Sequence, residues 1–250
     1  MHVETAGVDV RYVVAGSGDP AVLLGDAGLG PWQWGWQHDA LAGPYRTLTV
    51  DPRGHGESTG TPESVETLAA DLDRVLADAG VDRAHLVGFG LGGATALAYA
   101  REFGRARTLT LLGTAPTGES VDADAAESLF DPPEDLSGLF TGSFREARPD
   151  LCDRIATWRA EEDAPAEIRR AALDALAAFD AGPLYELTLP ALVLHAVDDP
   201  VVPMEAGAEL GEGLPNGRFE AMAGRRLAHA EFSAAVNDEI LGFLEAHPLD

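Results

Sequence analysis

The segment from Leu86 to Gly93 contains the residue spacing most closely tied to chemistry in this sequence. An apolar run enters Gly88-Phe89-Gly90-Leu91-Gly92, and a helix-like stretch of small residues follows. This is the form of a nucleophile elbow, a sharp turn between a strand and a helix whose central side chain attacks the substrate. The central residue of such a turn is Ser, Cys or Asp, but here it is Gly90. The turn is therefore predicted to lack a nucleophile.

The elements that position this turn follow from the pattern of the whole chain. Short β-branched and apolar runs alternate with helix-like stretches, which predicts an α/β fold with a mainly parallel sheet and helices on both faces. The predicted strands are Val8–Ala15, Ala21–Leu24, Thr47–Val50, His85–Phe89, Thr108–Leu112, Ala191–His195 and Arg218–Met222. Apolar or small residues at helical spacing predict helices over Ser64–Ala79, Leu91–Phe103 and Glu231–Leu244.

Residues 117–187 have a different pattern from the rest of the chain. They are acidic and contain helical pieces around Asp150–Arg159 and Ala166–Phe179, with no strand-like run between them. Because this stretch lies between two predicted strands, we expect an inserted helical lid over the carboxyl ends of the sheet. Residues 1–116 and 188–250 are then expected to form the core.

The composition excludes several classes of partner. The net charge is −25 and all 17 basic residues are arginine, so nucleic acid and anionic membranes would be repelled. The single cysteine, Cys152, and the absence of a basic, apolar leader at Met1–Thr5 predict a cytoplasmic protein. No spacing is typical of a metal site or a cofactor loop, so neither is expected. The expected partner is a small molecule, and the chain is expected to be a monomer or homodimer.

Four ordered motifs show a resemblance to a known family. They are Leu23–Gly28, Asp51–Ser58, the elbow at Gly88–Gly92, and Leu192–Pro203 near the end of the chain. In this order and spacing the sequence resembles the α/β-hydrolase family over nearly its whole length. The resemblance implies the α/β-hydrolase fold, but a fold alone does not specify an activity.

The resemblance also implies where a catalytic acid and histidine would stand. The family's triad runs in the order nucleophile, acid, histidine, which points to Asp199 as the acid. Counting back from Glu231 places Arg226 at the histidine position, and a guanidinium stays protonated and cannot act as a base. His229 lies three residues further on. It is expected either to take the base's role through a shifted loop or to make a local hydrogen bond at a helix entry.

The third departure from the family lies at the oxyanion hole. The family's His-Gly step is replaced by Gly25-Asp26, and the expected backbone donors are Ala27 and Leu91. A carboxylate at Asp26 would oppose a developing negative charge unless a cation neutralises it or it is protonated. Arg226 could pair with Asp199, and it could equally reach Asp26 or a carboxylate on the substrate.

The candidate site residues are therefore expected to surround one pocket. Asp26, Asp199 and Arg226 are interpreted either as groups for proton transfer and charge stabilisation or as a salt bridge left from a lost site. The ligand-binding candidates are the residues expected to surround these three, namely Ala27, Leu91, Trp32, Phe89 and His229.

These departures predict a non-hydrolytic member of the family. It would bind a small, largely apolar carbonyl compound under the lid and act as a cyclase, lyase or isomerase through shape and acid–base assistance. Two alternatives stay open: a catalytically inactive binding or receptor-type protein, and a residual hydrolase that uses His229. Epoxide hydrolase and dehalogenase chemistry is excluded at this point, because both require Asp at the centre of the elbow.

Overall fold

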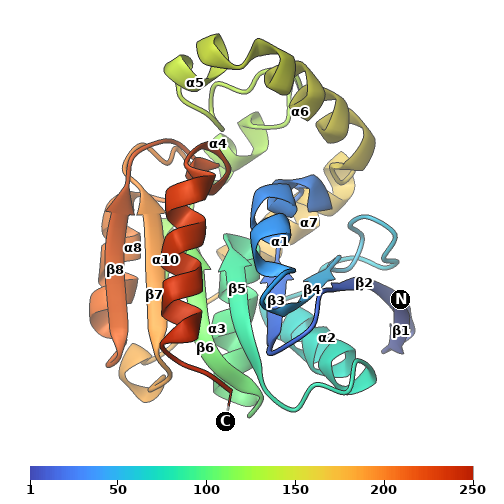
Figure 1. Ribbon diagram of the computed structural model, residues 1–250. Helices are drawn as coiled ribbons and strands as arrows, with labels where there is room; N and C mark the ends of the chain where they lie inside the picture. The colour runs from blue at the N-terminus through green and yellow to red at the C-terminus, as the bar shows by residue number, and fades with distance from the viewer. Residues whose placement is uncertain (250) are drawn as a thin grey trace.

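The computed structural model describes residues 1–249, and its centre is an eight-stranded sheet (Figure 1). The strand order is β1-β2-β4-β3-β5-β6-β7-β8. The pairs β1–β2 and β2–β4 are antiparallel, and the other pairs are parallel. The strands are β1 His2–Thr5, β2 Val8–Ala15, β3 Pro20–Leu24, β4 Arg46–Val50, β5 Ala84–Phe89, β6 Ala106–Leu112, β7 Ala191–Ala196 and β8 Gly217–Met222.

The predicted fold class is confirmed, and the reason lies in the central strands. Every residue of β5 and β7 is buried, as expected for parallel strands that are covered by helices on both faces. Such strands are continuous apolar runs in the sequence, so they are readily predicted. The sequence pattern missed β1, which has only four residues at the edge of the sheet and alternates between exposed and buried positions.

Helices cover both faces of this sheet (Figure 1). On one face lie α1 Gly35–Leu41 and α10 Ser233–Glu245, and on the other lie α2 Val65–Asp78, α3 Leu91–Glu102 and α8 Met204–Gly213. The predicted cap of α2 is present, because the Ser64 hydroxyl accepts a hydrogen bond from the Thr67 amide at 3.2 Å. Within residues 1–249, no helix is long and apolar enough to cross a bilayer.

A group of helices stands over the carboxyl ends of the parallel strands (Figure 1). In the sequence this group follows β6 and precedes β7. Its members are α4 Ala123–Ser128, α5 Gly142–Ala147, α6 Pro149–Glu162 and α7 Ala166–Ala177. The buried Arg159 guanidinium holds this group together, since it donates to the carbonyl groups of Leu129 and Pro133 and pairs with Asp163 at 3.0 Å. Whether the group moves as a lid stays a prediction.

The chain between β8 and α10 is tied to these upper helices. The Leu227 amide donates to the Leu139 carbonyl at 3.0 Å, and the Glu231 carboxylate accepts from the Thr141 amide at 3.0 Å. The single helix predicted over Glu231–Leu244 is wrong at its start. A short helix, α9 Ala228–Glu231, ends at Phe232, whose backbone angles of φ −108° and ψ 37° break the helix before α10.

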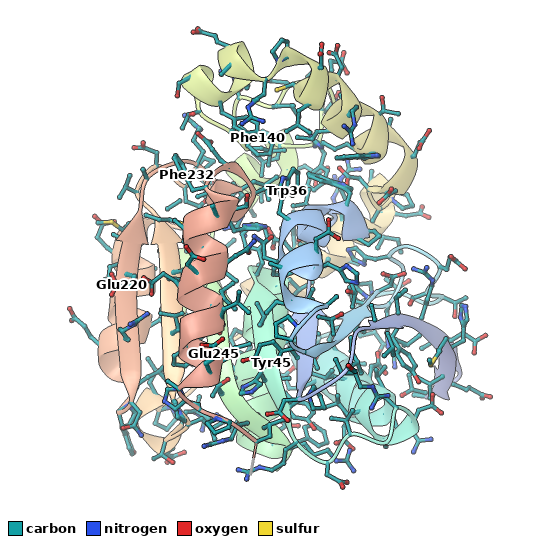
Figure 2. All side chains as sticks on the ribbon, in the orientation of Figure 1. Trp36, Tyr45, Phe140, Glu220, Phe232 and Glu245 are labelled. Atoms are coloured by element: carbon teal, nitrogen blue, oxygen red, sulfur yellow. The ribbon has the colours of Figure 1, made fainter. Side chains whose placement is uncertain are left out.

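Figure 2 shows side chains filling the space between the upper helices and the core, with Phe140 on the upper side and Trp36 on α1. The exposed fraction of Phe140 is 0%, and that of Trp34, on the one-turn 3-10 helix η1 Pro31–Trp34, is 2%. The carboxyl ends of the strands are therefore covered by packed apolar side chains. Any site beneath them is closed in this conformation.

Candidate active site

The turn between β5 and α3 has the geometry of the predicted elbow. Gly90 has φ 52° and ψ −112°, a region in which a residue with a Cβ is strained by about 1–3 kcal/mol. Its amide donates to the Leu112 carbonyl at 3.0 Å. A Cβ on Gly92 would overlap the Leu24 carbonyl, so glycine is also required where α3 passes close to β3.

The Asp26 carboxylate fills the space in front of Gly90. A Cβ built on Gly90 would overlap Asp26 Oδ1 and Arg226 Nη2. Oδ1 accepts a hydrogen bond from the Leu91 amide at 3.0 Å, and the Asp26 amide donates to Gln33 Oε1 at 2.9 Å. A carboxylate from a distant loop therefore stands where the side chain of residue 90 would project, and it takes up the first amide of α3.

Arg226 joins two buried carboxylates. Its Nε and Nη2 contact Asp26 Oδ2 at 3.0 and 2.6 Å, and its Nη1 contacts Asp199 Oδ2 at 2.8 Å and the Gly113 carbonyl at 3.0 Å. The guanidinium also lies 4.6 Å from the centre of the Phe89 ring. Burial lowers the pKa of Arg226, but the charges of Asp199 and Asp26 and their hydrogen bonds raise it by more. Arg226 is therefore a fixed cation.

Asp199 is held in place by the turn that follows β7. Its Oδ1 accepts hydrogen bonds from the amides of Val201 and Val202 at 2.8 and 3.2 Å. His195 Nε2 lies 3.9 Å from Asp199 Oδ2, but it is 2.9 Å from the Val202 carbonyl, and burial lowers the pKa of His195. The neutral His195 therefore supports the turn and does not pair with Asp199 as a cation.

His229 is buried beside this network as a neutral imidazole. Its ring centre lies 4.6 Å from that of Phe89 and 5.5 Å from that of Trp34. Burial lowers the pKa of His229 to about 3, so the ring carries no charge at neutral pH. Within residues 1–249, His229 Nε2 is buried and has no hydrogen-bond partner. The ring is therefore buried, with a hydrogen bond to the backbone of Gln33 and with Nε2 left without a partner in the described chain.

A small cavity connects His229 with the ion pairs. Its volume is about 10 Å³, and its walls include His229, Arg226, Asp199, Phe89 and Gly113. A polar cavity needs roughly 10–15 Å³ of such volume to hold one water molecule. This cavity is therefore close to the size of a single water, next to a neutral histidine and a fixed cation.

The structure brings together Asp26, Asp199, Arg226, Phe89, Leu91 and His229, and their functional roles stay predictions. Ala27 is also buried in this region, and its amide donates no hydrogen bond to residues 1–249. Trp32 does not line the His229 cavity. Its indole donates to Asp163 at 2.8 Å and lines a separate cavity of about 460 Å³ beside Trp36 and Trp158.

Sequence reasoning missed two residues that hold the site. Gln33 orients Asp26, and Trp34 packs on His229. Nothing in their spacing separates them from ordinary packing residues. His55 has a structural role, because Nε2 accepts from the Gly28 amide at 2.9 Å and Nδ1 lies 3.0 Å from the Arg53 carbonyl.

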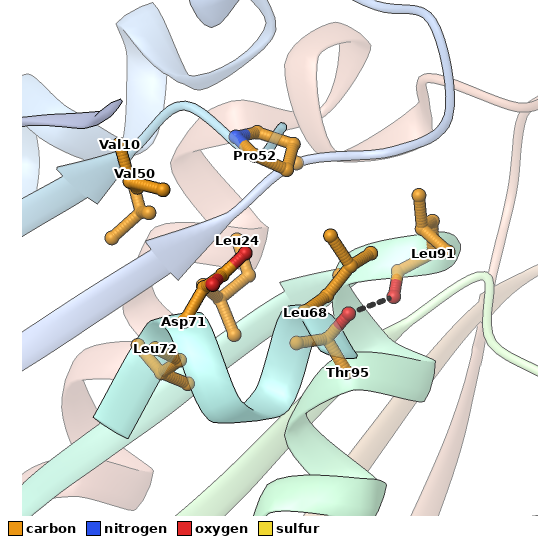
Figure 3. A pocket seen from close by; sticks show the side chains of 11 residues that line it. Val10, Leu24, Val50, Pro52, Leu68, Asp71, Leu72, Leu91 and Thr95 are labelled. Atoms are coloured by element: carbon orange, nitrogen blue, oxygen red, sulfur yellow. Dashed lines mark hydrogen bonds between the residues drawn. The ribbon is translucent and has the colours of Figure 1, made fainter. Parts of the chain in front are cut away.

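A second small cavity lies between β3, α2 and α3 and has a different character (Figure 3). Its volume is about 20 Å³, and its lining is mainly aliphatic. Its one carboxylate, Asp71, is paired with the buried Arg53 at 2.5 Å, and Thr95 Oγ1 donates to the Leu91 carbonyl at 2.9 Å. These polar groups already have partners, so this cavity is a packing gap in the core.

Comparison with known proteins decides the family. Residues 16–239 match the sequence profile described as the Alpha/beta hydrolase family. The chain belongs to the α/β-hydrolase family. The α/β-hydrolase fold extends over the whole chain, since a thermophilic esterase from Thermogutta terrifontis aligns with a TM-score of 0.86 and 25% identity, covering 100% of both chains.

Relatives of this α/β-hydrolase carry hydrolase names. A 2-hydroxy-6-oxononadienedioate/2-hydroxy-6-oxononatrienedioate hydrolase from Paraburkholderia phymatum is 29% identical, covering 98% of this chain and 94% of its own. A 3-oxoadipate enol-lactonase from Acinetobacter baylyi is 24% identical, covering 93% and 92%. The expectation of a non-hydrolytic cyclase, lyase or isomerase is therefore wrong. That expectation rested on the glycine at position 90, whereas the relatives are named as hydrolases.

Proposed function

We propose that this protein is a hydrolase that adds water directly to a small carbonyl compound such as an ester or lactone. In this proposal it lacks the side-chain nucleophile at Gly90, and Arg226 replaces the histidine of the family's triad. Water is then the nucleophile and His229 is the base. The observation that carries the proposal is the unpartnered Nε2 of a buried, neutral His229 that lines a cavity of about one water's volume.

The proton transfers balance within this set of residues. A water oxygen attacks the substrate carbonyl carbon while His229 Nε2 takes one of its protons. The tetrahedral intermediate then breaks its bond to the leaving oxygen, and the proton on His229 passes to that oxygen. The products are a carboxylic acid and an alcohol, or one hydroxy acid when the substrate is a lactone.

The cation and the backbone amides supply the charge stabilisation. Arg226 lines the same cavity as His229 and remains protonated. The amides of Leu91 and Ala27 are the candidate donors to the oxyanion. Leu91 donates to Asp26 Oδ1 in this conformation, so the substrate carbonyl has to displace that carboxylate. Movement of the helices in residues 117–187, which we propose to act as a lid, would open the site.

The names of the relatives fit a substrate with a carbonyl group. The relative from Paraburkholderia phymatum is named as a hydrolase of oxo-dioates, and the relative from Acinetobacter baylyi is named as an enol-lactonase. Loss of a triad's nucleophile and base lowers rates by about 10⁴–10⁶-fold, so turnover is expected to be slow.

The experiment is a rate measurement on activated esters and lactones combined with intact-mass spectrometry of the protein. Turnover above background, with no acyl group added to the protein during it, is expected. An acylated protein mass would contradict direct attack by water. Absence of turnover on the whole panel would contradict the proposed hydrolase activity.

A further inference from the structure

A second polar cavity lies on the outer side of the ion-pair network. It has a volume of about 290 Å³ and is formed by the segment around Thr141, which precedes α5, and by the loops after β7 and β8. Its charged lining residues are Arg145, Arg225 and Asp198. None of its residues lines the His229 cavity. In Figure 1, α5 belongs to the upper helices on the side of β8.

Two arginines at this cavity have no partners in the described chain. Neither Arg145 nor Arg225 forms an ion pair with residues 1–249, although the sequence holds 42 acidic and only 17 basic residues. The Nε atom of each is buried and has no acceptor there. Buried donors are normally satisfied, so two buried Nε–H donors without acceptors at one cavity need an explanation.

We propose that Arg145 and Arg225 bind the oxyanion group, carboxylate or phosphate, of a small molecule. A guanidinium group presents parallel N–H donors that match the two oxygens of such a group. Ser137 lines the same cavity, but its hydroxyl is hydrogen-bonded to the Asp135 carboxylate, so the two arginines carry the proposal. The volume is at the lower end of the range for small-molecule pockets, about 300–1,000 Å³, which fits a short organic acid or a phosphate.

The position of Asp198 makes the proposal specific. Asp198 lines the cavity and forms no ion pair within 4.0 Å among residues 1–249, so its negative charge repels an incoming anion. Asp198 and Arg225 each directly precede a member of the buried network, Asp199 and Arg226. The two loops therefore carry Asp199 and Arg226, which form an ion pair inside the protein, and Asp198 and Arg225, which line this cavity.

The test is isothermal titration of the full chain with succinate and, separately, with inorganic phosphate at low ionic strength. We expect binding of at least one of them, weakened about tenfold or more by Arg225→Gln and by Arg145→Gln. Asp198→Asn is expected to tighten binding, because it removes the like charge. The matched control is Arg148→Gln, which makes the same change of charge at an exposed residue outside the cavity and should stay within about twofold.

The two probes distinguish the sources of the oxyanion. Stronger binding of succinate assigns the cavity to an organic acid, and stronger binding of phosphate assigns it to a phosphorylated compound. No binding of either probe at 10 mM would overturn the proposal. An equal loss in Arg148→Gln and Arg225→Gln, or weaker binding in Asp198→Asn, would also overturn it, because the effect would then follow net charge or folding.

Discussion

The Asp26 carboxylate and a side chain at residue 90 are mutually exclusive in this structure. A Cβ on Gly90 would overlap Asp26 Oδ1, and the same oxygen accepts the Leu91 amide at 3.0 Å. A side chain at residue 90 and the carboxylate of Asp26 would therefore occupy the same space. A substitution at either position acts on the other.

Gly90→Ala is expected to destabilise the fold by at least about 2 kcal/mol. The residue has a φ of 52°, which strains a Cβ by about 1–3 kcal/mol, and the added carbon also displaces Asp26. The measurement is urea unfolding followed by circular dichroism. Adding Asp26→Gly should recover part of the loss, because it removes the overlapping carboxylate.

The control for this prediction is Gly35→Ala. Gly35 has a φ of −50°, and a Cβ there meets no atom within 4 Å. We expect a change within about 1 kcal/mol. An equal loss in Gly35→Ala and Gly90→Ala, or no recovery in the double variant, would show that Asp26 does not limit residue 90.

Arg226→Met is expected to cost about 3–5 kcal/mol in the free energy of unfolding at neutral pH. It leaves the buried carboxylates of Asp26 and Asp199 without their cation. The loss should shrink as the pH falls, because protonation removes the uncompensated charges. Arg218→Met is the control, since Arg218 pairs with Glu239 at the surface and such pairs contribute about 0–1 kcal/mol. Equal losses in the two variants would contradict this account of the buried network.

The thermal stability of the protein should fall between pH 6.5 and pH 4, in part because of His229. Its pKa is lowered from 6.5 to about 3 in the folded protein, so the unfolded chain binds a proton over this range and the folded chain does not. The contribution is fully present above pH 6.5 and is lost progressively as the pH falls towards 3. His229→Gln should reduce the slope of Tm against pH. An unchanged slope would show that His229 is not neutral in the fold.

Asp26→Ala is expected to raise the rate of ester hydrolysis by about tenfold or more. It frees the Leu91 amide and leaves Arg226 paired with Asp199, and one oxyanion-hole donor is worth about 10²–10³ in rate. The comparison is kcat/KM for an activated ester in the wild type and the variant. A lower kcat/KM in a folded Asp26→Ala variant would instead show that the carboxylate takes part in the reaction.

The sequence predicted the architecture better than the site. β5 and β7 are continuous apolar runs because both faces are buried, and such runs are readily recognised. The short edge strand β1 was missed because it has only four residues, which alternate between exposed and buried positions, although it pairs with the neighbouring β2. The break at Phe232 was missed because the segment before it is held by hydrogen bonds to Leu139 and Thr141, which are distant in the sequence.

The contact between Asp26 and Gly90 could not be predicted from either residue alone. It requires the loop after β3 to reach the start of α3, and this placement is fixed by Gln33, whose position in the sequence carries no signal. The position of His229 against Phe89 also depends on packing, here in the short helix α9. The functional prediction failed for another reason, since a glycine at the centre of the elbow was taken to mean the absence of hydrolysis.

The most direct test of the proposed function is kcat/KM for an activated ester at pH 7 in the wild type, His229→Gln and His38→Gln. General-base catalysis contributes about 10²–10⁴ in rate, so His229→Gln is expected to lower kcat/KM by at least about 10². His38→Gln, a substitution on the outward part of α1, should leave it unchanged. Equal values of kcat/KM in the wild type and a folded His229→Gln variant would contradict the proposal that His229 activates water.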